Sequence, residues 1–166
     1  CATHLYNAMS QLGHREPGMV GAALTGKNWC GLIADGYHVS TEAMQVAMAA
    51  RPEGLFLVTD CMAPAGTDVA EFTLGGRRIL RRDGRLTLED GTLAGADLTM
   101  TDALRIMVHE VGASKEVAFA MATSRPAACL SRSDIGHLRP GARADFVHIG
   151  EDFSLRGVWR AGQRLH

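Results

Sequence analysis

The sequence of 166 residues is poor in aromatic residues and in cysteines, and it has no long apolar run. Its four cysteines include no Cys-x-x-Cys pair, so we expect them to be isolated small hydrophobic residues rather than disulfide partners. No stretch approaches the roughly 20 apolar residues that cross a bilayer, and the first residues show no signal-peptide pattern. We therefore expect no membrane partner and a cytoplasmic location.

An excess of charge of either sign is also missing. The formal net charge of −1 gives no basic field, so nucleic acid is not an expected partner. The largest blocks of like charge are Arg77-Arg78 and Arg81-Arg82, and we expect these arginines to lie on a solvent-exposed β-ribbon. A hydrophobic content of 46% with 21% charged residues is ordinary for a globular protein, and the length suits one domain.

What the chain does contain is a set of apolar segments that end in polar residues. Residues 55–58 form an apolar run that leads directly to Asp60. Two earlier segments, residues 3–9 and 30–38, repeat this pattern and carry His4 and His38. In α/β barrels, polar groups at the carboxyl ends of successive parallel strands converge on one pocket. We therefore expect His4, His38 and Asp60 to face each other.

Helical patterns alternate with these segments. Residues 41–50 follow Ser40, a good helix cap, and carry alanine and methionine at helical spacing until Pro52 stops them. Further helices are expected from Thr101 to about Val111 and from Ser114 to Thr123. The succession of strand, helix and strand predicts the parallel unit of a barrel.

Between residues 71 and 95 the pattern changes to short β-rich runs. They are separated by Gly75-Gly76 and by Asp83-Gly84, and such pairs are strong hairpin signals. This segment is therefore expected to be an inserted β-ribbon. Short strands are expected again at residues 145–149 and 157–159.

Several motifs occur in a fixed order over nearly the whole chain. They are Thr3–Met9, Arg15–Gly18, Ala34–His38, Val58–Gly66, Asp90–Gly95, Leu98–Met100 and Gly136–Asp145. Together they resemble the motifs of the N-acetylglucosamine-6-phosphate deacetylases, a family of the amidohydrolase superfamily. The last motif alone, which leads into Val158–Gly162, would indicate only an amidohydrolase.

The resemblance implies an α/β fold with the last strands and helices of a (β/α)8 TIM-type barrel. Residues 1–130 would belong to the barrel, with a β-hairpin inserted at 71–95, and residues 131–166 would form part of a small β-sandwich domain. The family's earlier strands carry a glutamate and a histidine of the metal site that this chain lacks, and the chain opens on Cys1 rather than Met. We therefore expect the carboxy-terminal part of a longer enzyme, with a genuine short paralogue as the alternative.

The resemblance also implies a reaction, the metal-dependent deacetylation of N-acetylglucosamine 6-phosphate in amino-sugar catabolism and recycling. Asp60 would take a proton from metal-bound water and pass it to the leaving amine, and His4 would bind the single divalent metal ion, zinc or iron. Arg15 would reach the substrate of a neighbouring subunit, which implies a homodimer. The implied substrate-binding residues are Asn7, Ala8, Arg15, Asp35, Gly36, Tyr37, His38, Leu93, Ala94 and Gly95.

Without the resemblance, each of these residues has a simpler interpretation. A lone histidine such as His4 is more often a structural residue, and Asp60 suits a helix cap. Arg15 suits a surface ion pair, and glycine explains residues 35–38 and 93–95 as backbone turns.

Two other functions stay open at this point. One is another amidohydrolase, acting on a cyclic amide or a different N-acetyl sugar. The other is a non-catalytic chain, such as a fragment or a dimerisation scaffold. Arg15 and the Asn7-Ala8 pair favour a phosphorylated substrate, because a substrate without phosphate would give them no anion to hold. Metal content would discriminate between an enzyme and a scaffold.

Overall fold

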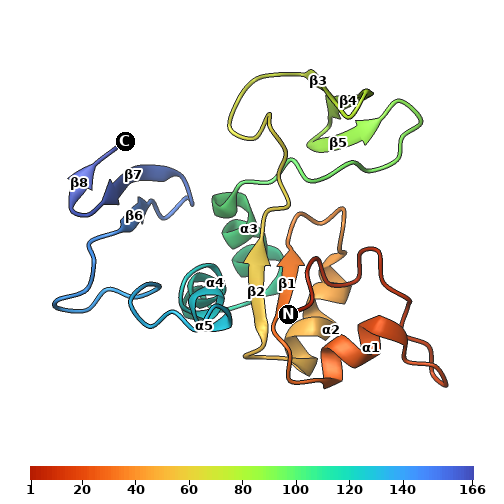
Figure 1. The fold of residues 1–166 in the computed structure, drawn as a ribbon, viewed down its shortest axis with the longest axis horizontal. Coiled ribbons are helices and arrows are strands. Elements are labelled where there is room, and N and C mark those ends of the chain that lie inside the picture. The colour runs from red at the N-terminus through yellow and green to blue at the C-terminus, as the bar shows by residue number, and fades with distance from the viewer.

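The computed structural model describes residues 1–166 and has a mixed α/β architecture (Figure 1). Its helices are α1 (Gly18–Thr25), α2 (Thr41–Ala50), α3 (Met100–Ile106), the π-helical turn η1 (Met107–Val111), α4 (Lys115–Ala122) and α5 (Ser124–Cys129). Its strands are β1 (Cys30–Ile33), β2 (Leu55–Val58), β3 (Glu71–Leu74), β4 (Arg77–Arg82), β5 (Arg85–Leu88), β6 (Phe146–Ile149), β7 (Leu155–Arg160) and β8 (Gln163–Arg164). No helix has the length and the apolar content that a bilayer crossing requires.

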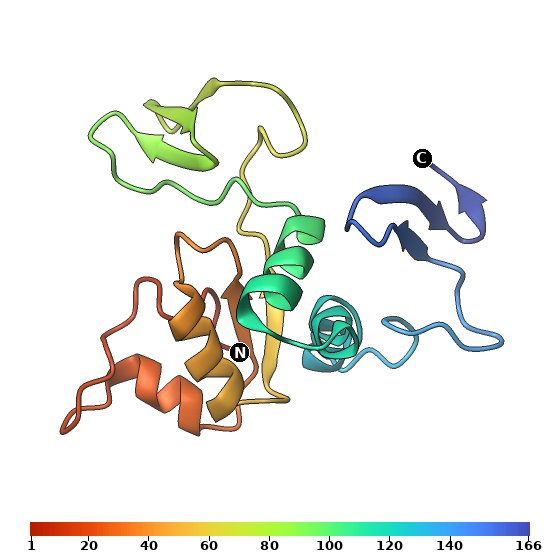
Figure 2. The ribbon, with the colours of Figure 1, turned by 180° about the vertical axis from the view of Figure 1, so that it is seen from behind.

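A parallel pair of strands lies at the centre of the molecule. In this pair Cys30 is opposite Leu55 and Ile33 is opposite Val58, while Ala2 adds an isolated parallel bridge to Cys30. Helices α3, α4 and α5 contact β2, and α1 and α2 lie on the side of β1 away from α4 and α5 (Figures 1 and 2). All four residues of β1 are buried, as expected for a parallel strand that is covered on both faces.

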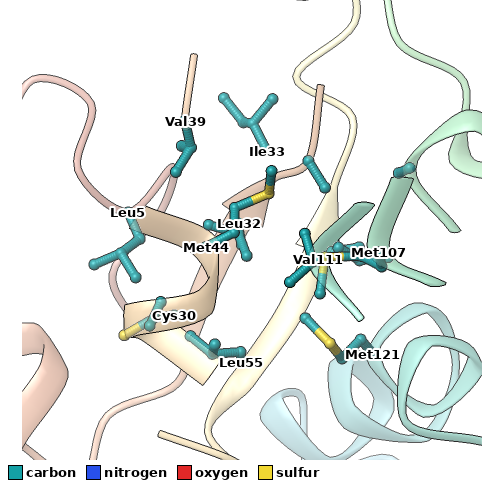
Figure 3. Close-up of a cluster of buried hydrophobic side chains, with 14 of the residues drawn as sticks. Leu5, Cys30, Leu32, Ile33, Val39, Met44, Leu55, Met107, Val111 and Met121 are labelled. Atoms are coloured by element: carbon teal, nitrogen blue, oxygen red, sulfur yellow. The ribbon is translucent and has the colours of Figure 1, made fainter. Parts of the chain in front are cut away.

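The hydrophobic core forms around this pair. Leu32 and Leu55 are fully buried, and Met44 of α2 meets them from one side while Met107 and Met121 approach from the other (Figure 3). No polar or charged residue is buried in the core. Burial of these apolar side chains therefore fixes the positions of β1 and β2, and with them the loops that follow each strand.

Two separate antiparallel sheets complete the fold. Strands β3, β4 and β5 pair in that order, with turns at Gly75-Gly76 and Asp83-Gly84 as the sequence predicted. This ribbon lies beyond the carboxyl ends of β1 and β2 (Figures 1 and 2). Strands β6, β7 and β8 form the third sheet. Strand β7 covers the strand expected at residues 157–159, and β6 begins one residue later than the strand expected at 145–149.

The capped helices also begin where the sequence placed them. The Ser40 hydroxyl accepts a hydrogen bond from the Ala43 N–H at 3.3 Å at the start of α2. The Ser114 hydroxyl accepts one from the Val117 N–H, also at 3.3 Å, at the start of α4. The helix expected at residues 101–111 differs at its end, because it passes from α-helix to a π-helical turn after Ile106.

The prediction that His4 stands on a strand is wrong. Residues 3–9 form a turn in which His4 has φ 37°, Tyr6 has φ 76° and Ala8 has φ 53°. Only Ala2 forms a β-bridge with β1. The Leu5 N–H then donates to the Gly31 carbonyl at 2.8 Å, and the chain continues as a turn. The central sheet has two strands, so the partial TIM-type barrel and its division from the small β-domain stay predictions.

Candidate active site

The loops after β1 and β2 carry the polar residues of the candidate site. Asp35 and His38 follow β1 directly, and Asp60 follows β2. Because β1 and β2 are parallel, these two loops leave the sheet at the same edge. The turn of residues 3–9 lies beside them, since its backbone bonds to Gly31 of β1.

His38 and Asp35 form a tight pair within the first loop. His38 Nδ1 lies 2.6 Å from Asp35 Oδ2, and both side chains are less than a tenth exposed. The other carboxylate oxygen accepts the backbone N–H groups of Tyr37 at 2.9 Å and His38 at 2.8 Å. This network fixes the orientation of the imidazole ring and places its proton on Nδ1.

The pair shifts the pKa values of both groups. The hydrogen bond to Asp35 raises the pKa of His38, burial opposes the rise, and the charges of Asp35 and Asp60 add to it. Burial by itself would raise the pKa of Asp35, but the hydrogen bonds from His38 and from the two backbone N–H groups outweigh it and lower this pKa. The negative charge of Asp60 thus adds to the stabilisation of the charged form of His38.

The directions of the two pKa shifts set the pH range in which the His38–Asp35 pair stabilises the fold. The stability that the raised pKa of His38 contributes is complete below about pH 6.5, and it is lost as the pH rises through the pKa of His38 in the folded protein. The contribution of the Asp35 shift is complete above about pH 3.8 and is lost as pH falls through the folded pKa. The pair therefore stabilises the fold most between about pH 4 and pH 6.5.

Asp35→Asn is expected to lower the pKa of His38, because the amide keeps the shape of the carboxylate but loses its charge. Asp60→Asn should lower it by a smaller amount, since Asp60 acts on His38 only through its charge. An NMR titration of the His38 ring protons measures both effects. Asp68→Asn is the matched control, because Asp68 is exposed and outside this network. A His38 pKa that is the same in Asp35→Asn as in the wild type would contradict the pairing.

Asp60 has an unusual backbone conformation, with φ 49°. Its carbonyl oxygen accepts the Ala96 N–H at 3.0 Å, and Cys61 forms a parallel bridge with the same residue. The segment that precedes α3 thus holds the Asp60 turn in place, while the Asp60 side chain stays exposed.

A cleft of about 610 Å³ lies between Asp60 and the ribbon. Leu93, Ala94 and Gly95 line it together with Asp60, so two groups of predicted site residues share one cavity. Gly95 has φ 94°, and a Cβ atom there would lie 2.6 Å from Met62 Cγ. A glycine is therefore favoured where the cleft wall passes close to the Met62 side chain.

One ring nitrogen of His4 is free to bind a metal ion, because the other forms a hydrogen bond within the protein. Its Nδ1 lies 2.9 Å from the carbonyl oxygen of Asn7, and because a carbonyl only accepts, the proton of the neutral ring stands on Nδ1. The lone pair of Nε2 is then available. However, no group of three or more His, Cys, Asp or Glu side chains in the chain could hold a metal ion. Zinc sites use three or four protein ligands, so the residues present do not fit the expected ion by themselves.

Tyr37 connects the His38 loop to the ribbon. Its hydroxyl donates to the Asp83 carbonyl at 3.3 Å, and the guanidinium of Arg85 lies 4.3 Å from the centroid of its ring. The second turn of the ribbon therefore rests on the loop that presents His38. Tyr37 contacts the protein here, and its role toward a substrate stays a prediction.

Arg81 does not line the cleft, but it makes contacts beside it that sequence reasoning missed. It was expected in solvent, but its guanidinium donates to Asp97 Oδ1 and to the Pro64 carbonyl, both at 2.8 Å. It thereby joins the segment after Asp60 to the segment after Gly95, each of which continues a stretch that lines the cleft. Nothing in an arginine-rich strand indicates which of its side chains meets a neighbouring loop.

Of the predicted site residues, only Asp60, Leu93, Ala94 and Gly95 line the cleft. Arg15 lies in the exposed loop before α1, where its side chain forms no ion pair or hydrogen bond. Ala8 is exposed at the end of the turn of residues 3–9, and the Asn7 side chain donates to the Leu5 carbonyl at 3.3 Å. The structure therefore groups Asp35, His38 and Asp60, while the phosphate-binding role of the other residues stays a prediction.

Polar side chains at the carboxyl ends of adjacent parallel strands are the arrangement from which α/β-barrel enzymes build their active sites. The sequence matches the model of the Amidohydrolase family over residues 1–165, and the chain belongs to this family. The resemblance drawn from the motifs is thus confirmed at the level of the family.

Two relatives extend this comparison. The chain is 41% identical to an N-acetylgalactosamine-6-phosphate deacetylase of Shewanella sp. (strain ANA-3), over 99% of this chain and 42% of the relative. It is 40% identical to a putative N-acetylgalactosamine-6-phosphate deacetylase of Escherichia coli (strain K12), over 96% of this chain and 97% of the relative. The chain therefore spans less than half of the first relative and nearly all of the second.

Solved structures show the same likeness. The N-acetylglucosamine-6-phosphate deacetylase of Pasteurella multocida superposes with a TM-score of 0.95 at 33% identity, over 98% of this chain and 44% of that protein. The corresponding enzyme of Thermotoga maritima gives a TM-score of 0.90 at 32% identity, over 99% of this chain and 46% of that protein. The three sheets and their helices are thus the arrangement found in part of these larger structures.

Proposed function

We propose that this chain contributes the carboxy-terminal part of the active site of a deacetylase for N-acetylhexosamine 6-phosphates. The observation that carries this proposal is the position of Asp60, which leads out of β2, shares a cleft with residues 93–95 and acts electrostatically on His38. The names of the relatives and of the solved structures support the same substrate class.

The residues of this chain suit the proton transfers of amide hydrolysis. Asp60 has no side-chain partner in the protein, so its carboxylate is free to accept a proton from the attacking water and to return it to the leaving amine. The raised pKa of His38 favours its protonated form, which donates a hydrogen bond to a substrate oxygen or phosphate. The expected divalent metal, zinc or iron, belongs to this proposal with His4 as one ligand, and its other ligands lie outside this chain.

Other predictions belong to the same proposal. They are the partial TIM-type barrel at residues 1–130, the small β-domain at residues 131–166, the homodimer, the cytoplasmic location and the role in amino-sugar catabolism. The motifs favour N-acetylglucosamine 6-phosphate as the substrate. The C4 epimer N-acetylgalactosamine 6-phosphate is the second candidate, because the relatives at 41% and 40% identity carry that name.

A chimera tests the proposal directly. Residues 1–166 replace the matching part of the Pasteurella multocida enzyme, whose structure superposes with a TM-score of 0.95. The chimera should release acetate from at least one of the two epimers, and the ratio of kcat/KM values then identifies the preferred sugar. A folded, metal-loaded chimera that releases no acetate from either epimer would overturn the proposal.

Arg15→Ala in this chimera should raise KM for the phosphorylated sugar about ten- to hundredfold more than KM for the unphosphorylated sugar. The guanidinium can pair only with the phosphate, and a hydrogen bond between charged groups contributes roughly 1.5–3 kcal/mol. Arg139→Ala is the control, since Arg139 is also exposed and forms no ion pair. Equal effects of Arg15→Ala on KM for both sugars would contradict a role of Arg15 in phosphate recognition.

A further inference from the structure

The cleft beside Asp60 has one cationic side chain in its lining, that of Arg77. The remaining lining residues are uncharged apart from Asp60 itself. The cleft therefore carries a carboxylate from the β2 loop and a guanidinium from the ribbon. A ligand that fills it meets one negative and one positive group.

The backbone of Arg77 is held by a tight turn at the rim of the cleft. Arg77 is paired with Leu74 in the β3–β4 hairpin, and Gly75 and Gly76 between them have φ values of 57° and 77°. Two successive residues with positive φ form the two-residue hairpin turn that matches the twist of the strands. Leu74 and Gly75 line the same cleft, so this side of the turn belongs to its wall.

Arg77 forms no ion pair, unlike Arg78 and Arg81, although its charge helps to lower the pKa of the exposed Asp90. Arg78 pairs with Glu71 and with Glu89, the latter at 3.4 Å, and Arg81 pairs with Asp97 at 2.8 Å. Arg77 forms no ion pair within 4.0 Å and donates no side-chain hydrogen bond. Its planar guanidinium thus keeps the donor pairs that suit the oxygens of phosphate or carboxylate.

We propose that Arg77 binds an anionic group of the ligand that occupies the Asp60 cleft, and so contributes to the choice of ligand. The proposal rests on the proposed function, under which two oxyanions are available, the phosphate of the sugar and the carboxylate of the released acetate. Arg15 does not line this cleft, so within one chain Arg77 is the arginine whose side chain lines it together with Asp60.

Equilibrium binding to the chain of residues 1–166 tests the assignment without any turnover. Titration calorimetry with glucosamine 6-phosphate, glucosamine and acetate compares the wild type with Arg77→Ala. Loss of one charge-assisted hydrogen bond should weaken binding of the recognised anion about tenfold and leave glucosamine unchanged. A loss confined to glucosamine 6-phosphate identifies the phosphate, a loss confined to acetate identifies the carboxylate, and a loss for both shows general anion binding.

Two neighbouring arginines provide matched controls. Arg82→Ala removes an equally unpaired charge that lies outside the cleft, and Arg78→Ala removes one that is already paired. Both variants should bind all three ligands as the wild type does. The assignment is overturned if Arg77→Ala binds both anions normally, if Arg82→Ala shows the same loss, or if the wild type binds neither anion. Because no acetate release is measured, failure of the deacetylase proposal would be seen separately in the chimera.

Discussion

Asp60→Asn is expected to lower kcat for acetate release by a factor on the order of 100 to 10,000, the usual contribution of a general acid or base. The side-chain amide has nearly the same shape as the carboxylate but cannot accept the proton of the attacking water. The fold should be kept, because the contacts of Asp60 within the protein are made by its backbone. The measurement is acetate release by the chimera with saturating substrate.

The control for this variant is Asp68→Asn, the same chemical change at an exposed position farther along the same loop. It should keep the turnover of the parent chimera. If Asp60→Asn keeps more than about a tenth of that turnover with its metal content unchanged, Asp60 is not the proton-transfer group.

Leu32→Ala should produce the largest loss of stability among single substitutions in β1. Leu32 is fully buried at the centre of the parallel pair, and removing a buried leucine side chain costs about 2–5 kcal/mol from lost burial and the remaining cavity. That is a large part of the roughly 5–15 kcal/mol that keeps an ordinary domain folded. Urea unfolding followed by circular dichroism measures the change in free energy.

Leu138→Ala is the matched control for the core, because Leu138 is 73% exposed. It removes the same atoms from a side chain that is mostly in water, so its effect should stay within about 0.5 kcal/mol. Equal unfolding midpoints for the two variants would show that β1 does not lie at the centre of the core.

The elements predicted correctly are those whose signals are local. Ser40 and Pro52 bound α2 because a cap and a helix breaker act on neighbouring residues. The Gly75-Gly76 and Asp83-Gly84 turns fix the ribbon for the same reason, since positive φ values are needed at those positions. Short-range rules of this kind need no knowledge of the rest of the fold.

The elements that were missed depend on distant contacts. Helix α1 begins at Gly18 and contains Gly21, so its sequence has weak helix propensity and packing decides its structure. The pattern of residues 3–9 indicates a strand end, because it joins apolar and polar residues as residues 55–60 do. The segment becomes a turn because Leu5 bonds to Gly31, a contact that no local pattern shows.

The site shows the same division between local and distant information. The ordered motifs predicted the loops after β1 and β2, and the structure brings His38, Asp35 and Asp60 to one edge of the sheet. Arg77, Arg78 and Arg82 are exposed on the ribbon as predicted, whereas Arg81 is half-buried because loops fold back onto the ribbon. Neither the Arg81–Asp97 pair nor the opening beside Arg77 has a signature in the spacing of residues.

The ribbon of β3, β4 and β5 pairs with no other sheet, and all its strands lie within residues 71–88. It can therefore open as one cooperative unit while β1 and β2 stay paired. Amide hydrogens of the ribbon should exchange with solvent faster than those of Leu32 and its neighbours. One wall of the Asp60 cleft belongs to this ribbon, so the cleft is lost whenever the ribbon opens. A ligand that contacts both walls would therefore slow the exchange of the ribbon amides.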